Sequence, residues 1–225
     1  MSYRISILDK SPLAAGETAA QALARTLTLA QHAEASGLPP LLGRRTPQYR
    51  SAGEPLAGAG YRPRLLGHTR RIRLGSGGVM LQHYSPYKVA ENFNLLAALA
   101  PGRIDLGVGK APGGLPLSTR ALQQGLHQEE KGTFADQLAQ LDNWLSLTEP
   151  GERRAYAPRR SRRAGQTVFC SAPALESAEL AARLDWNFVF AAHLNGDSAL
   201  RRAVFNRWRE LSPREAMVAV RCGGC

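Results

Sequence analysis

The stretch Arg71–Gly114, RIRLGSGGVMLQHYSPYKVAENFNLLAALAPGRIDLGVGKAPGG, decides the fold of this chain. Ile72 and Leu74 alternate with arginines and lead into Gly75–Gly78, a pattern typical of a short strand that ends in a tight turn. Residues 85–100 then predict a helix, because a serine can cap it, a proline suits its first turn and apolar residues recur at helical spacing.

A second strand is predicted directly after this helix. Pro101 and Gly102 stop the helix, and apolar residues alternate again over residues 104–108. Since a helix carries the chain back between the two strands, we expect them to pair in parallel as a βαβ unit. Gly109 and Lys110 follow the second strand, at the edge where parallel α/β proteins place their chemistry.

Helical periodicity continues on both sides of this unit. Residues 17–36 predict a helix closed by Gly37. Further helices are predicted within residues 120–147, over 175–184 and over 199–211. The first helix is expected to bury Ala20, Leu23, Leu27, Ala30 and Ala33, and the second to bury Phe134, Leu138, Leu141 and Leu145.

Length and composition indicate a cytoplasmic α/β protein with one domain over residues 1–225. The 225 residues fall short of a complete (β/α)₈ barrel, which typically needs about 250. No run of about eighteen apolar residues suggests a membrane span, and the N-terminus lacks the apolar core of a signal peptide. Three cysteines without paired spacing predict neither a disulfide framework nor a metal site.

The net charge of +11 is unevenly distributed. Residues 39–63, 151–173 and 221–225 carry +9 of it and contain all three cysteines. Aromatic residues do not alternate with the arginines as a nucleic-acid stacking surface would require, so nucleic-acid binding is not expected. These three segments are therefore atypical parts of the domain.

Three segments of the opening stretch resemble the luciferase-like flavin-dependent monooxygenases, a class of TIM-barrel oxidoreductases. They are Gly75–Leu81, Ser85–Phe93 and Pro101–Gly114, and the similarity returns at Ile5–Leu23 and Ser177–Asp197. The resemblance implies a (β/α)₈-type barrel that is incomplete at its C-terminus. A sheet without its last strands would keep an open edge or pair with another chain.

The resemblance also implies an activity. It predicts an FMN-dependent monooxygenase that uses reduced flavin and O₂ on a small apolar substrate such as an aldehyde. A separate flavin reductase would supply reduced FMN, because the chain lacks a nicotinamide-binding fingerprint. A deazaflavin-dependent oxidoreductase of the same fold and an inactive flavin-binding remnant are the alternatives. A homodimer is allowed, and no metal, membrane or nucleic-acid partner is expected.

Five residues are candidates for cofactor binding under this resemblance. Ser76, Gly77 and Gly78 would form a wall beside the isoalloxazine ring, since small residues let a backbone approach a flat ring; an ordinary strand-end turn is the alternative. Lys110 stands where the family usually has an arginine that contacts the FMN phosphate, and it would keep the charge without the bidentate fork. It could equally be a solvated lysine. Ser171 lies near the family's phosphate-binding Gly-Ser-Ser, although the glycine is absent.

The catalytic residues are unknown from the sequence. The Glu-His-His that the family presents after its second strand is absent, and His83 is the remaining candidate, with a structural histidine as the alternative. Codon degeneracy allows Pro40–Tyr49 to be encoded by bases that spell Arg-Phe-Trp-Val-Gly-Glu-His-His-Asn when read one base later. A similar shift at Cys170–Pro173 restores the Gly-Ser-Ser. We therefore hypothesise that the atypical segments are out of frame.

Overall fold

A computed structural model describes residues 7–37, 41–43, 61–110, 116–124, 130–146, 167–191, 196–212 and 219–220. The strands are β1 (Ile7–Asp9), β2 (Leu41–Gly43), β3 (Leu74–Ser76), β4 (Val79–Met80), β5 (Ile104–Gly109), β6 (Thr167–Ala172), β7 (Asn187–Phe190) and β8 (Ala219–Val220). The helices are α1 (Ala19–Ala35), α2 (Tyr61–His68), α3 (Pro86–Leu99), α4 (Pro116–Gln123), α5 (Phe134–Ser146), α6 (Leu175–Arg183) and α7 (Ser198–Leu211), with a 3₁₀ turn η1 (Leu81–His83).

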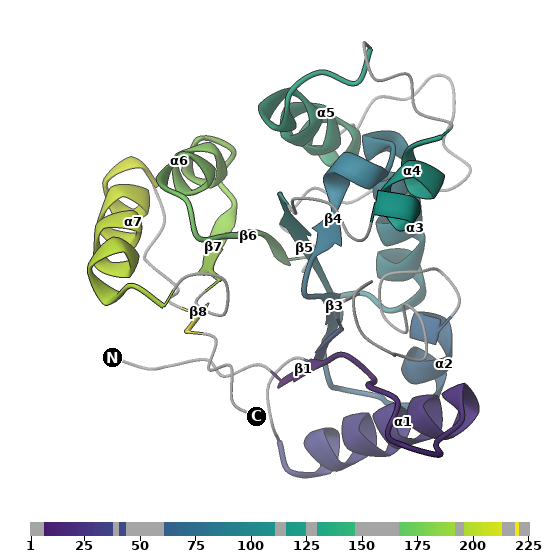
Figure 1. Cartoon of the computed structure of the whole chain (residues 1–225). Helices are drawn as coiled ribbons and strands as arrows, with labels where there is room; N and C mark the ends of the chain where they lie inside the picture. The colour runs from purple at the N-terminus through teal and green to yellow at the C-terminus, as the bar shows by residue number, and fades with distance from the viewer. Residues whose placement is uncertain are drawn as a thin grey trace.

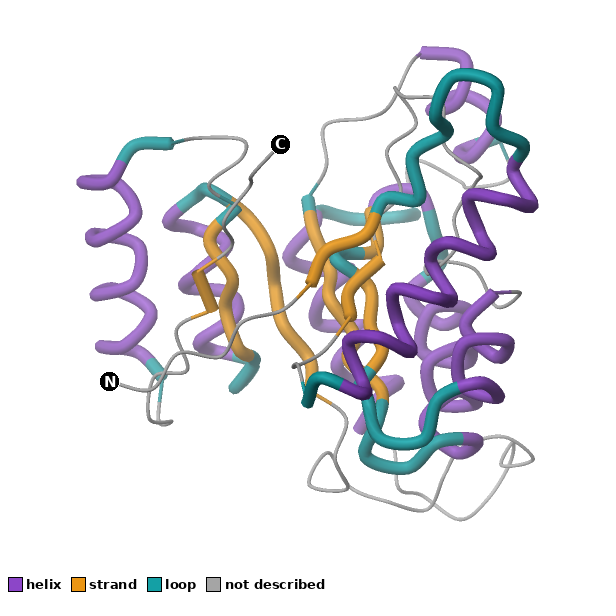
Figure 2. Tube along the Cα trace, turned by 90° about the horizontal axis from the view of Figure 1, so that it is seen from below, coloured by secondary structure: helices purple, strands orange, loops and turns teal. Residues whose placement is uncertain are grey.

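All strands belong to one parallel sheet in the order β1-β2-β3-β5-β6-β7-β8, with β4 also beside β5. Spatial order therefore follows chain order, as in a singly wound barrel, and the α/β expectation is confirmed. Figures 1 and 2 place α6 and α7 beside β6 and β7 and the earlier helices beside the first strands. Within the described residues β1 and β8 end the sheet without pairing to each other. None of the described helices is long and apolar enough to cross a bilayer.

The predicted βαβ unit is confirmed. β3 pairs in parallel with β5 through Leu74 and Ile104, and α3 carries the chain back between them. Pro86 occupies the first turn of α3 and Ser85 its N-cap position, although the serine side chain makes no capping hydrogen bond. After α3 the chain turns at Gly102, whose φ of 77° lies in the left-handed region that suits glycine.

The glycine run after β3 differs from the predicted tight turn. The chain bends only briefly at Gly77 and resumes as β4, where Val79 pairs with Val108. Gly75 pairs with Asp105 and Val79 pairs with Val108, so an advance of four residues from β3 to β4 lies opposite an advance of three residues on β5. One extra residue on one of two paired strands is a β-bulge. A strand with a bulge and a strand ending in a turn share the same small residues, so the sequence pattern could not separate them.

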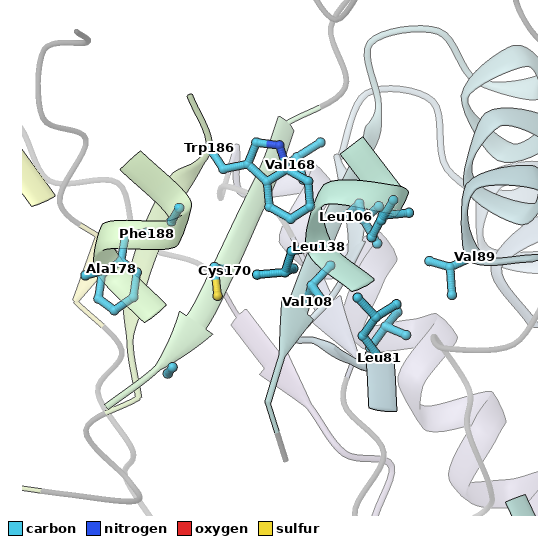
Figure 3. Close-up of a cluster of buried hydrophobic side chains, with 14 of the residues drawn as sticks. Leu81, Val89, Leu106, Val108, Leu138, Val168, Cys170, Ala178, Trp186 and Phe188 are labelled. Carbon is cyan, nitrogen blue, oxygen red and sulfur yellow. The ribbon is translucent and has the colours of Figure 1, made fainter. Parts of the chain in front are cut away.

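The main core lies between the sheet and its helices. Alternate residues of β5, β6 and β7 pack with α3, α5, α6 and α7 in one cluster of buried side chains. Figure 3 shows part of it, with Leu106, Val168 and Trp186 from the sheet side and Leu138 from α5. On the opposite face of the sheet, Phe169 and Val189 form a second cluster, against which Leu8 packs. The parallel strands are thus apolar on both faces.

The buried face of α1 was only partly predicted. The helix buries Ala22, Thr26, Ala30 and Ala33, whereas Ala20 is exposed and Leu23 and Leu27 are half-buried. Thr26 turns inward because its hydroxyl donates to the Asp9 carboxylate at the end of β1. Periodicity of apolar residues alone could not anticipate a threonine on the buried face. The buried face predicted for α5 is confirmed, with Leu145 partly buried.

Candidate functional site

The C-terminal ends of the central strands bring four sequence-predicted positions to one edge of the sheet. Gly109, the last residue of β5, pairs with Met80 at the end of β4, and Lys110 follows it. On its other side Gly109 lies against Ser171, whose carbonyl oxygen would stand 3.2 Å from a Cβ built on the glycine. His83 closes the η1 turn that continues from β4.

Ser76 is fully buried, and its hydroxyl is used by the protein itself. Ser76 Oγ donates to the Gly107 carbonyl oxygen and accepts from the Gly107 N–H, both at 2.9 Å. These bonds lie where the bulge interrupts the ladder between β3 and β5, so they replace the missing strand pairing. The Ser76 side chain therefore holds the bulge closed.

We call the line where β3 and β4 meet β5 the seam. Its glycines leave room for the backbone of the neighbouring strand. A Cβ on Gly78 would lie 2.9 Å from the Gly107 carbonyl carbon and oxygen. A Cβ on Gly107 would lie 2.3 Å from the Ser76 carbonyl oxygen and 2.4 Å from the Phe169 ring. Close strand packing thus accounts for Gly78 without a ligand, and the role of Ser76, Gly77 and Gly78 as a flavin wall stays a prediction.

Lys110 and Ser171 have a different environment. The Lys110 side chain is exposed and makes no ion pair with any residue that the structure describes. Ser171 is half-buried, and by strand alternation it shares the inner face of β6 with Phe169. A cation and a hydroxyl on adjacent strands are donors that suit a phosphate group.

A polar cluster surrounds η1, and sequence reasoning found only its histidine. His83 is 3 % exposed, and its Nδ1 lies 3.0 Å from Gln123 Nε2 at the end of α4. Gln123 Nε2 also lies 3.4 Å from the Gln82 carbonyl oxygen, to which Lys131 Nζ donates as well. Burial lowers the pKa of Lys131. A glutamine at a helix end and a lysine in a loop carry no sequence signal for such a cluster.

The opposite, N-terminal edge of the sheet is closed by an ion pair that the sequence analysis did not identify. Arg73, one residue before β3, pairs with the buried Asp105 on β5 through Nη2 and Oδ1, 2.5 Å apart. The same guanidinium donates to Thr167 Oγ1 at the start of β6 at 3.0 Å. The network links three strands at the end of the sheet away from Lys110. In barrels, residues at this N-terminal face serve stability and not catalysis.

Parts of the atypical segments are described and take regular places in the fold. Residues 41–43 form β2 between β1 and β3, and residues 167–172 form β6 between β5 and β7. Residues 44–49, where the out-of-frame reading places Glu-His-His, lie outside the described residues. Among the residues that the structure does describe, no group of His, Cys, Asp and Glu could hold a metal ion.

The described residues fit a phosphorylated flavin at this edge. Lys110 supplies a cation that forms no ion pair with a described residue, Ser171 a hydroxyl and η1 a buried histidine, while β5 ends in Gly109, which has no side chain. A planar ligand can approach the backbone closely only where no side chain projects. Ser76 is the exception, because its hydroxyl is bound to Gly107.

Comparison with known proteins shows the family of the chain. The family model for luciferase-like monooxygenases matches residues 3–219. The chain is 46 % identical over 204 residues to the N-acetyl-S-alkylcysteine monooxygenase of Bacillus subtilis (strain 168), which covers 86 % of this chain and 58 % of that protein. It is 33 % identical over 224 residues to a luciferase-like monooxygenase of Escherichia coli (strain K12), covering 96 % of this chain and 64 % of the relative.

Solved structures show the same fold. Apo-MsnO8 superposes with a TM-score of 0.79 at 28 % identity and covers 98 % of this chain and 64 % of its own. The FMN complex of the oxygenating component of 3,6-diketocamphane monooxygenase from Pseudomonas putida has a TM-score of 0.69 at 15 % identity, covering 98 % and 66 %. An F420-dependent secondary alcohol dehydrogenase has a TM-score of 0.62 at 15 % identity, covering 98 % and 68 %.

The chain thus spans less than two thirds of the length of these curated relatives, and the match runs through nearly all of its own residues. The family match agrees with the observed fold, a parallel sheet whose strands follow chain order with a βαβ unit at its centre. This chain belongs to the luciferase-like monooxygenase family.

Proposed function

We propose that the protein is a flavin-dependent monooxygenase that holds FMN at the C-terminal edge of β5 and β6. The observation that carries the proposal is that the exposed Lys110 directly follows β5, while Ser171 lies on the paired strand β6, so that two phosphate-compatible donors come from neighbouring strands. Ser76, Gly77 and Gly78 would lie at the ring side of the site. When bound, reduced flavin would supply the chemistry that activates O₂.

Family membership supports the choice of cofactor without fixing its type. One protein of the same fold holds FMN and another uses F420, a deazaflavin. Lys110 is a point charge that could bind either phosphate. FMN is the first choice and the deazaflavin the second, with reduced FMN supplied by a separate reductase and O₂ as co-substrate.

Flavin binding tests the proposed site. The purified chain is titrated with FMN and with riboflavin, which lacks the phosphate, and binding is followed by quenching of flavin fluorescence. Lys110→Ala should weaken FMN binding about tenfold, the loss of a charged contact worth about 1.4 kcal/mol, and leave riboflavin binding unchanged. Lys88→Ala is the matched control, because Lys88 lies on α3 and pairs with Glu91. Equal loss for both flavins would place the phosphate elsewhere.

The substrate is proposed as a small apolar molecule such as an aldehyde. The 46 % identity to an N-acetyl-S-alkylcysteine monooxygenase favours an S-alkylated cysteine derivative as a second candidate. Both compounds are supplied with FMN, NADH, a flavin reductase and ¹⁸O₂, and products are analysed by mass spectrometry. Incorporated ¹⁸O with either compound identifies the substrate class. Flavin binding without oxygenated product would support the inactive remnant.

The nucleotide sequence tests the out-of-frame hypothesis. We expect single-base changes on both sides of the codons for residues 40–49 and on both sides of those for residues 170–173. Codons at residues 44–49 that cannot spell Glu-His-His one base later would refute it. A restored reading frame would supply the histidine pair that the family uses, and turnover would then be measured on the corrected protein.

A further inference from the structure

A buried network of hydrogen bonds ties the loop after β1, residues 10–18, to the first helix. The Thr26 hydroxyl on α1 donates to Asp9 Oδ2 at the end of β1, at 2.5 Å, and lies 2.6 Å from the Ser11 hydroxyl. The Ser11 N–H donates to Asp9 Oδ1 at 2.8 Å. Ser11 and Thr26 are buried, so water does not compete for these bonds. We call Asp9, Ser11 and Thr26 the latch.

Ser11 holds a backbone conformation that serine rarely adopts. Its φ of 44° lies in the left-handed region, where the Cβ of any residue other than glycine crowds the backbone. A residue in such a conformation persists only where surrounding contacts hold it, and such residues gather at functional and switching segments. Here the contacts come from the latch, which engages both the N–H and the hydroxyl of Ser11. The latch therefore holds the loop against the preference of its own backbone.

The other ties between this loop and α1 are exposed. Arg25 on α1 donates to the Pro12 carbonyl oxygen and pairs with Glu17, whose carboxylate accepts from the Ala14 N–H. The Arg25 side chain is 48 % exposed, and exposed ion pairs contribute little to stability. The latch is thus the buried tie that decides whether the loop stays in place.

The loop begins at the edge of the sheet that carries the proposed flavin site. Leu8 on β1 packs against Phe169 and Val189 on the inner face of the sheet, so the end of β1 comes close to β6 and β7. Ser171 follows Phe169 by two residues toward the C-terminal end of β6. Loops at this edge of a barrel-type sheet can cover or uncover a ligand site.

We propose that the latch holds the loop over residues 10–18 closed in a strained conformation, and that its release opens the loop and admits flavin to the C-terminal edge of the sheet. Opening separates Ser11 from Thr26 and lets Ser11 return to a negative φ, so relief of backbone strain offsets part of the lost hydrogen bonding. The gating role rests on the proposed flavin function, whereas the latch is a property of the protein without ligand.

Amide hydrogen exchange followed by NMR on the ligand-free chain tests the latch. Thr26→Val keeps the side-chain shape but removes the hydroxyl, and it should speed exchange at residues 10–14 about fivefold, the effect of losing one hydrogen bond. Ser11→Ala should do the same from the loop side. Ser11→Gly should speed exchange less than Ser11→Ala, because glycine adopts a φ of 44° without strain. Thr28→Val is the matched control, since the Thr28 hydroxyl also donates one turn back along α1, to Ala24, but lies outside the latch.

Stopped-flow quenching of FMN fluorescence then tests the gate. If the loop controls entry, Thr26→Val raises both the association and the dissociation rate of FMN, and Thr28→Val changes neither. Unchanged exchange in Thr26→Val and Ser11→Ala, or a rise spread over the whole chain, overturns the latch. Equal exchange in Ser11→Ala and Ser11→Gly overturns the strain. Faster exchange with wild-type flavin rates overturns the gate. A wild type that binds no flavin overturns the proposed function and the gate with it, and the exchange rates alone then decide the latch.

Discussion

Gly107→Ala should be among the most destabilising single-methyl changes in this chain. The added Cβ would lie 2.3 Å from the Ser76 carbonyl oxygen, a backbone atom, and 2.4 Å from the Phe169 ring. The ring can rotate, but Ser76 is held by two hydrogen bonds to Gly107 itself. Overpacking costs about 1–3 kcal/mol, and losing these hydrogen bonds adds about 1 kcal/mol each. We therefore expect a loss of about 3–5 kcal/mol in the free energy of unfolding.

Urea denaturation followed by tryptophan fluorescence measures this loss. The matched control is Gly67→Ala, because Gly67 lies in α2 and a Cβ built on it meets no atom within 4 Å. The control should raise stability by about 0.5–1 kcal/mol, the helix preference of alanine over glycine. Gly107→Ala combined with Phe169→Ala should remain destabilised, since the backbone clash persists. A Gly107→Ala protein within about 1 kcal/mol of wild type would refute the bulge geometry.

Three further outcomes follow from buried or hydrogen-bonded side chains. Burial would raise the pKa of Glu34, but hydrogen bonds from the backbone of Arg71, Ile72 and Arg70 outweigh it and lower the pKa. Glu34→Gln should therefore cost stability near neutral pH, and the difference from wild type should vanish in pH titrations as wild-type Glu34 protonates below its usual value of 4.5. Asp142→Ala should cost about 1–3 kcal/mol in thermal unfolding, because Trp186 Nε1 donates to Asp142 at 2.7 Å; Asp142→Asn keeps an acceptor and should cost less. Burial raises the pKa of Cys170 to about 12, so peptide mapping after alkylation near neutral pH should find it modified only once the protein unfolds.

The central βαβ unit could be predicted because two independent patterns agree. Alternation marks β5, and helical spacing with Pro86 and Gly102 bounds α3. The buried face of α5 was predicted for the same reason, since its apolar residues fall on one side of the helix. Local patterns of this kind need no knowledge of distant contacts.

The features that the sequence did not predict depend on contacts between residues far apart in the chain. The buried hydroxyl of Thr26 has partners at the end of β1 and on the loop after it, the Asp9 carboxylate and the Ser11 hydroxyl. The bulge at Ser76 needs the backbone of β5, and the His83 cluster needs Gln123, which lies 40 residues away. For the candidate site, the sequence could place Lys110 and Ser171 near strand ends, but the pairing of β5 with β6, which makes these strands neighbours, came from the structure.

The seam between Ser76 and Gly107 has a consequence for reading related sequences. Its small residues are required for two strands to lie together around the bulge, whatever the protein later does with a ligand. A copy of this fold that had lost its chemistry would still need them in order to fold, whereas no described residue packs against Lys110 in a way that demands a cation there. The glycine signature therefore reports architecture, and under the proposed function the charge at Lys110 is the better indicator of whether a given copy still binds flavin.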